Sequence, residues 1–117
     1  MKRILIVEDE VITAMNLSDL LEMWGFEPGE PVTSGEEAIS RAGKERPDLV
    51  LMDVKIKGEI GGIEAARKIN EELGIPIILM SGYSKNLITE QISENRDIRY
   101  ISKPLDLGKL KQMIEAL

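Results

Sequence analysis

Apolar residues follow two kinds of pattern along the chain. Continuous runs such as Ile-Leu-Ile-Val at 4–7 and Leu-Val-Leu-Met at 49–52 are typical of strands buried on both faces of a parallel sheet. Elsewhere, as in 63–73, apolar residues recur every three or four positions, which is typical of an amphipathic helix. The pattern predicts strands at 3–7, 26–32, 48–53, 76–80 and 98–101, and helices at 10–24, after Ser34, at 63–73, at 85–94 and after Asp106.

This alternation predicts the fold class. Alternating strands and helices form a parallel sheet with helices on both faces. The segment 26–32 contains Pro28 and Pro31, and 98–101 is interrupted by Arg99, so we place both strands at the edges. Right-handed crossovers then favour a doubly wound (βα)5 fold of flavodoxin-like type, with a parallel five-stranded sheet in the order 2-1-3-4-5. The length of 117 residues suits a single α/β domain over 1–117.

The segment at 58–62, which reads Gly-Glu-Ile-Gly-Gly, is rich in glycine. Glycine leaves the backbone unusually free. The composition therefore predicts a mobile loop between the third strand and the following helix.

Acidic residues stand where two of the predicted central strands end. Glu8 and Asp9 follow the first strand, and Asp53 ends the third. In the predicted order these strands are neighbours, and their carboxyl ends meet at the crevice where open α/β sheets bind ligands. Three carboxylates there would repel one another strongly unless a cation lay among them. Ser81 and Lys103 follow two other strands and reach the same edge of the sheet.

Composition narrows the chemistry. The chain has no histidine and no cysteine, which excludes Ser-His-Asp and Cys-His catalysis, His/Cys zinc sites and a phosphohistidine carrier. Carboxylate ligands suit Mg²⁺, with Mn²⁺ as a second choice. The net charge of −6 disfavours direct nucleic-acid binding. We find no signal peptide and no run of about 18 apolar residues, so we expect a cytoplasmic protein without a membrane span.

Taken singly, each polar group has an ordinary structural explanation. An acid after a strand often caps the next helix, Ser81 alone is typical of a turn, and Lys103 alone is typical of a solvated surface. Complementary groups on four strand ends are much harder to explain as independent accidents. The combination therefore indicates a functional site.

The chain resembles the receiver domain of two-component response regulators along almost its whole length. The segments that carry the resemblance are Ile-Leu-Ile-Val-Glu-Asp-Glu at 4–10, Ser-Gly-Glu-Glu-Ala at 34–38, Pro-Asp-Leu-Val-Leu-Met-Asp at 47–53, Gly-Ile-Glu-Ala at 62–65, Pro-Ile-Ile-Leu-Met-Ser-Gly at 76–82 and Lys-Pro at 103–104. Each segment is a weak signal alone. Their order and spacing make the combination specific.

The resemblance implies a metal-assisted phosphoacceptor. It implies that Asp53 takes a phosphoryl group and that Asp9 and Asp53 bind Mg²⁺ directly. Glu8 would act on the metal mainly through water, and the backbone carbonyl of Lys55 would supply a further ligand oxygen. Such a cation would screen the acids from the incoming phosphoryl group.

The resemblance also implies a switch. Lys103 would pair with a phosphoryl oxygen, and a cis peptide between Lys103 and Pro104 would aim it into the site. Ser81 would donate a hydrogen bond to another phosphoryl oxygen. Tyr100 would then turn inward behind Ser81 and change the surface of helix 85–94, strand 98–101 and the last helix.

Partners follow from the same resemblance. A sensor histidine kinase or a phosphotransfer protein would supply the phosphoryl group, and a downstream protein would bind the switch surface. A phosphorylation-dependent homodimer is compatible with this scheme. The protein would not be an enzyme for an external substrate, because it would catalyse only its own Mg²⁺-dependent phosphorylation and dephosphorylation.

Two other classes of function stay open on the residues alone. A flavodoxin-like protein would bind a flavin phosphate after the first strand, but Glu8-Asp9-Glu10 would repel that phosphate. An aspartyl-phosphate phosphohydrolase commonly has a second acid two residues after its nucleophile, where this chain has Lys55. Flavin absorbance would identify the first class, and multiple turnover of a phosphate ester would identify the second.

Overall fold

The computed structural model describes residues 2–82 and 97–117. Five parallel strands form one sheet in the order β2-β1-β3-β4-β5, which confirms the predicted topology. The strands are β1 (Arg3–Val7), β2 (Glu27–Pro28), β3 (Leu49–Asp53), β4 (Ile77–Ser81) and β5 (Ile98–Ser102). The described helices are α1 (Val11–Met23), α2 (Gly35–Glu45), α3 (Gly62–Leu73) and α5 (Leu107–Glu115). The helix predicted at 85–94 lies outside the described residues.

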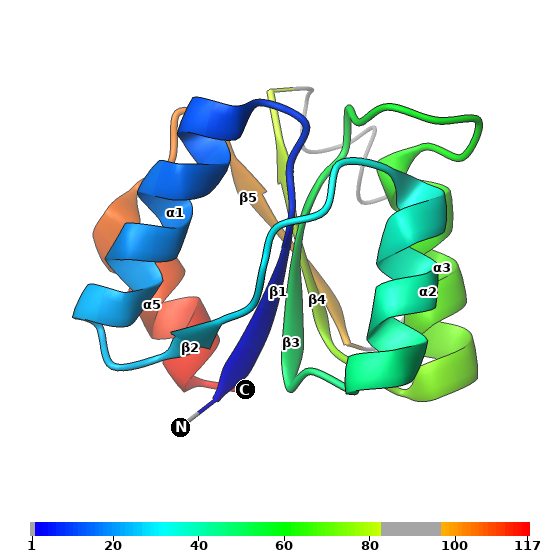
Figure 1. Ribbon diagram of the computed structural model, residues 1–117. Coiled ribbons are helices and arrows are strands. Elements are labelled where there is room, and N and C mark those ends of the chain that lie inside the picture. Colours follow the sequence, from blue (N-terminus) through cyan, green and yellow to red (C-terminus); the bar gives the residue numbers. More distant parts are fainter. Residues whose placement is uncertain (1, 83–96) are drawn as a thin grey trace.

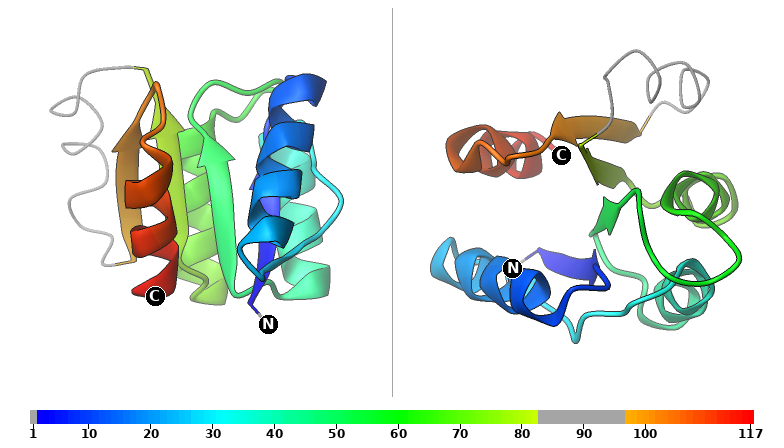
Figure 2. Two further views of the ribbon diagram at one scale, coloured as in Figure 1. Left: turned by 90° about the vertical axis from the view of Figure 1, so that its left-hand side faces the viewer. Right: turned by 90° about the horizontal axis from the view of Figure 1, so that it is seen from above.

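The helices cover the two faces of the sheet in pairs. Helices α1 and α5 pack on one face, and α2 and α3 on the other (Figures 1 and 2). Because side chains alternate across a strand, each apolar run divides between the two layers. In β1, Leu5 and Val7 face the α2–α3 layer, whereas Ile4 and Ile6 face the α1–α5 layer. The two hydrophobic layers explain why the central strands are continuously apolar.

The strand register brings the sequence-predicted polar residues to one edge. Val7, the last residue of β1, pairs with Met52 of β3, so Glu8 lies beside Asp53 in the sheet. Asp53 in turn pairs with Met80, the residue before Ser81. Because the strands are parallel, Glu8, Asp53 and Ser81 lie side by side at the carboxyl ends of β1, β3 and β4.

Helix boundaries agree closely with the sequence pattern. Ser34 caps α2, where its hydroxyl oxygen accepts a hydrogen bond from the Glu37 backbone N–H at 3.2 Å, and Asp106 caps α5 in the same way. Helix α1 starts one residue later than predicted, because Glu10 serves as its N-cap. Helix α3 starts one residue earlier than predicted, at Gly62.

The second strand is much shorter than predicted. Only Glu27–Pro28 pairs with β1, and Val32 forms an isolated bridge with Val7. Pro28 and Pro31 lack the backbone N–H that a longer ladder needs, which confines this segment to the sheet edge. Within 2–82 and 97–117, none of the helices has both the length and the apolar character needed to cross a membrane.

Candidate functional site

An open cleft lies at the carboxyl edge of the central strands. It has a volume of about 510 Å³ and is lined by Asp9, Glu10, Asp53, Lys55, Ser81, Gly82 and Lys103. The cleft therefore brings together Asp9, Asp53, Ser81 and Lys103, as the sequence predicted. Glu8 does not line it: its side chain is buried at the end of β1. Sequence reasoning left Glu10 out of the site, although its position directly after Glu8-Asp9 was the available signal.

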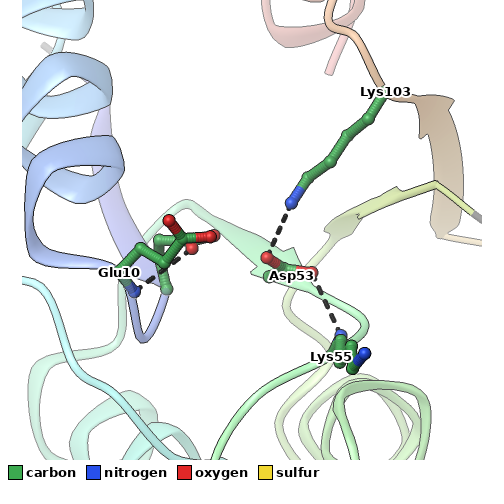
Figure 3. A network of polar contacts seen from close by, with 5 residues as sticks. Glu10, Asp53, Lys55 and Lys103 are labelled. Atoms are coloured by element: carbon green, nitrogen blue, oxygen red, sulfur yellow. Dashed lines mark hydrogen bonds and ion pairs between the residues drawn. The ribbon is translucent and has the colours of Figure 1, made fainter.

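Asp53 is the central group of the cleft. It is buried, with 5% of its surface exposed, because it ends a strand that is covered on both faces. Its Oδ1 accepts a hydrogen bond from the Lys55 backbone N–H at 3.0 Å, and its Oδ2 lies 2.7 Å from the Lys103 Nζ (Figure 3). These contacts hold the carboxylate from both sides.

Lys103 reaches Asp53 from the segment between β5 and α5. Its backbone N–H donates to the Ser81 carbonyl at 2.8 Å, and its peptide bond to Pro104 is cis. Burial by itself lowers the pKa of Lys103, but the hydrogen bond and charge of Asp53 outweigh it, so the pKa rises above its ordinary value. Lys103 is thus held as a cation beside the Asp53 carboxylate.

Glu8 is a buried acid directly behind the cleft. Its Oε1 accepts a hydrogen bond from the Glu10 backbone N–H at 3.3 Å, whereas its Oε2 is buried and has no hydrogen-bond partner among the described residues. Burial, followed by the nearby Asp53 carboxyl, raises the pKa of Glu8 from 4.5 to about 8. Burying this acid therefore opposes folding increasingly as the pH rises from about 4.5 to about 8.

The donor chemistry of the cleft fits a hard divalent cation. Asp9 and Asp53 line the same cavity, and the Glu8 Oε2, which has no hydrogen-bond partner among the described residues, lies behind it. Carboxylate oxygens are the preferred ligands of Mg²⁺. The sequence predicted that three acids converge on one point. Among the described residues, no group of three such side chains is placed to hold a metal ion. The Lys103 ammonium also supplies a positive charge beside Asp53.

Two further predicted residues lie next to the cleft. Ser81 ends β4 and is buried, with 1% of its surface exposed. Tyr100 is half-buried on β5, where it pairs with Leu79 and packs against the hydrophobic layer under α2 and α3. Strand β4 therefore connects the cleft to the strand that carries Tyr100. The predicted switch surface includes 85–94, which lies outside the described residues.

The strand order and the cleft define a flavodoxin-like α/β protein. Its acids and a lysine lie at the carboxyl edge of the sheet, where the strand order reverses between β1 and β3. Residues 4–115 match the family model of the response regulator receiver domain. The chain therefore belongs to the response regulator receiver domain family, which functions in two-component signalling.

Individual relatives agree with this assignment. The chain is 33% identical to the polar-differentiation response regulator DivK of Brucella ovis, over 98% of this chain and 94% of DivK. It is also 33% identical to the transcriptional regulatory protein PdtaR of Mycobacterium tuberculosis, over 97% of this chain. The chain spans only 55% of the length of PdtaR.

Solved structures show the same fold. A two-component response regulator of the LuxR family from an Aurantimonas species superposes with a TM-score of 0.89 at 29% identity, covering 99% of this chain and 84% of that one. A CheY-like receiver domain protein from Methanospirillum hungatei superposes with a TM-score of 0.87 at 27% identity, covering 99% and 92%. The flavodoxin-like architecture is therefore shared with response regulators.

Proposed function

We propose that residues 1–117 form a phosphoacceptor switch in which Asp53 takes a phosphoryl group from a histidine kinase or a phosphotransfer protein. The observation that carries this proposal is the buried Asp53 carboxylate, which faces an acid-lined cleft and lies 2.7 Å from the Lys103 ammonium. The protein acts on itself rather than on an external substrate. Its reactions are its own phosphorylation and the hydrolysis of the resulting acyl phosphate.

The contacts of Asp53 suit it to nucleophilic attack. One carboxylate oxygen attacks phosphorus while the bond from phosphorus to the donor's imidazole nitrogen or acetate oxygen breaks. The Lys55 N–H and the Lys103 ammonium hold the carboxylate, which lowers the entropic cost of reaching an in-line geometry. Lys103 then moves its hydrogen bond to an oxygen of the transferred group, which carries more negative charge than the carboxylate.

Asp9, Asp53 and the Lys55 backbone carbonyl would hold Mg²⁺, with Glu8 acting through water; Mn²⁺ suits the same oxygen ligands. Bound there, the cation would supply positive charge to offset that of the acids and the phosphoryl group. Among this chain's own residues, Asp9 and Asp53 both line the cleft, whereas Glu8 is buried behind it. This arrangement supports direct binding of Mg²⁺ by Asp9 and an indirect effect of Glu8 on the metal.

The signal would leave the site through β4 and β5. A phosphoryl group at Asp53 draws the Ser81 hydroxyl toward it, and Tyr100 on the neighbouring strand turns inward behind Ser81. The surface of β5 and α5, together with the helix predicted at 85–94 outside the described residues, would then change its affinity for a downstream protein or for a second copy of the chain. This is a two-state element biased by a local change of charge.

The direct test is phosphorylation by acetyl phosphate, followed by intact-mass spectrometry. We expect one phosphoryl group per chain in the presence of Mg²⁺ or Mn²⁺ and none after the metal is chelated. Labelling of equal extent with and without a divalent metal would refute the proposed chemistry.

The two acids after β1 are expected to differ in metal binding. Asp9→Ala should weaken Mg²⁺ binding by more than about tenfold, because it removes a carboxylate that lines the cleft. Glu8→Ala should have a much smaller effect, because Glu8 is buried and does not line the cleft. Calorimetric Mg²⁺ titration of both variants measures the difference. Equal losses of affinity would show that the direct ligand is misassigned.

A further inference from the structure

The segment between β3 and α3, residues 54–61, is held against the start of α2. We call it the β3–α3 loop. The Ile60 backbone N–H donates a hydrogen bond to the Glu36 Oε1 at 2.9 Å, and Lys57 forms an isolated parallel bridge with Ser34. Both contacts reach from the segment after Asp53 to the first residues of α2.

The two segments approach so closely that they need glycine. A Cβ at Gly58, where φ is +101°, would lie 2.3 Å from the Glu36 Oε2. A Cβ at Gly35 would lie 2.8 Å from the Ile60 carbonyl oxygen. These glycines therefore allow the Glu36 carboxylate and the helix start to lie directly against the loop.

Apolar side chains add to this attachment. Ile56 and Ile60 are partly buried and pack against the hydrophobic layer under α2 and α3. At the end of the loop, the Gly62 backbone N–H donates to the Val54 carbonyl at 3.0 Å. The loop is therefore in contact with α2 and with the hydrophobic layer, while the mobility that its glycine content predicts stays a prediction.

The loop begins at the reactive group. Lys55 is two residues from Asp53, to which its N–H is hydrogen-bonded, and two residues from Lys57, which forms a bridge with Ser34, the N-cap of α2. A loop that separates from α2 would lose the restraint on the Lys55 peptide. Among the described residues, the hydrogen bond from Ile60 to Glu36 joins the backbone of this loop to a side chain of α2.

We propose that Glu36 is a positioning residue for the phosphoacceptor site, because it fastens the β3–α3 loop to α2 and thereby fixes the Lys55 peptide beside Asp53. This inference rests on the proposed function, since it concerns the same metal and phosphoryl site. Glu36 acts only through the backbone that it holds. It does not line the cleft.

The test compares Glu36→Ala with Glu36→Gln and with Glu37→Ala. Glu37 lies in the same first turn of α2 and carries the same charge, but its carboxylate accepts a hydrogen bond from Thr33 rather than from the loop. The Gln variant retains an oxygen that can accept from the Ile60 N–H. The alanine variants therefore match in charge and differ in the loop contact.

Two readouts are measured on the full chain: hydrogen exchange of the Ile60 amide and the affinity for Mg²⁺. In Glu36→Ala we expect at least about tenfold faster exchange, because a hydrogen bond to a charged group is lost. Its Mg²⁺ affinity should fall about tenfold, as is common when a residue that orients a ligand is removed. Glu37→Ala and Glu36→Gln should both stay within about twofold of the wild type in Mg²⁺ affinity.

Substituting a residue that only stabilises the fold would lower the free energy of unfolding without this selective loss of Mg²⁺ affinity. Equal Mg²⁺ affinities in Glu36→Ala and Glu37→Ala would overturn the inference. If Glu36→Ala fails to fold, a Glu36→Gln variant with tenfold weaker binding would also overturn it, because the acceptor oxygen is still present. A wild-type chain that binds no Mg²⁺ would instead refute the proposed function.

Discussion

Asp53→Asn is expected to incorporate no phosphoryl group from acetyl phosphate, even at saturating Mg²⁺. The substitution preserves the shape of the side chain but replaces the nucleophilic carboxylate with an amide, which lacks the negative charge that attacks phosphorus. It also removes the anion that is paired with Lys103 at 2.7 Å. Intact-mass spectrometry before and after incubation measures the effect directly.

Asp19→Asn is the matched control for this experiment. Asp19 is an exposed aspartate on α1, away from the cleft, and the substitution makes the same change of charge. It should be labelled like the wild type. A folded Asp53→Asn protein that is labelled to full stoichiometry would show that another residue accepts the phosphoryl group.

Gly62→Ala is expected to destabilise the fold by about 3 kcal/mol or more, near the upper end of overpacking effects. A Cβ at position 62 would lie 2.3 Å from the Asp53 carbonyl oxygen and 2.7 Å from the Val54 Cα. Both neighbours are backbone atoms at the end of a buried strand, so neither can move aside at low cost. Helix α3 would have to shift away from β3, and urea unfolding measures the loss of stability.

Gly61→Ala provides the control one residue earlier. A Cβ there has no neighbour within 4 Å, and the backbone φ of −73° is open to any residue. Replacing the N-cap glycine lowers stability, because alanine is a poorer N-cap residue. The reduced freedom of the unfolded chain raises stability. We therefore expect a change below about 1 kcal/mol. Similar losses in both variants would contradict the close contact at Gly62.

The sequence was sufficient to predict the order of the strands in the sheet. The continuous apolar runs of β1, β3 and β4 divide between two hydrophobic layers, so their burial on both faces could be inferred from composition alone. Pro28 and Arg99 marked the edge strands correctly. The predicted order in turn placed Asp9, Asp53, Ser81 and Lys103 at one edge, where the structure brings them into one cleft.

Other features depend on contacts that no local pattern encodes. Sequence reasoning did not predict that Asp53 pairs with Lys103, or that Glu8 is buried with no partner for its Oε2 among residues 2–82 and 97–117. The sequence also showed no sign of the hydrogen bond from Ile60 to Glu36, because it joins residues 24 positions apart. Such side-chain contacts depend on how the layers pack, which becomes visible only in three dimensions.

The central claim is that the phosphoryl group resides on Asp53. Borohydride reduces an acyl phosphate to an alcohol, which converts a phosphorylated aspartate to homoserine. Peptide sequencing by mass spectrometry after Mg²⁺-dependent phosphorylation and borohydride treatment therefore locates the modified residue. The account predicts homoserine at position 53 and at no other acid, including Asp9. Homoserine at another position, or a labelled protein with an intact Asp53, would contradict it.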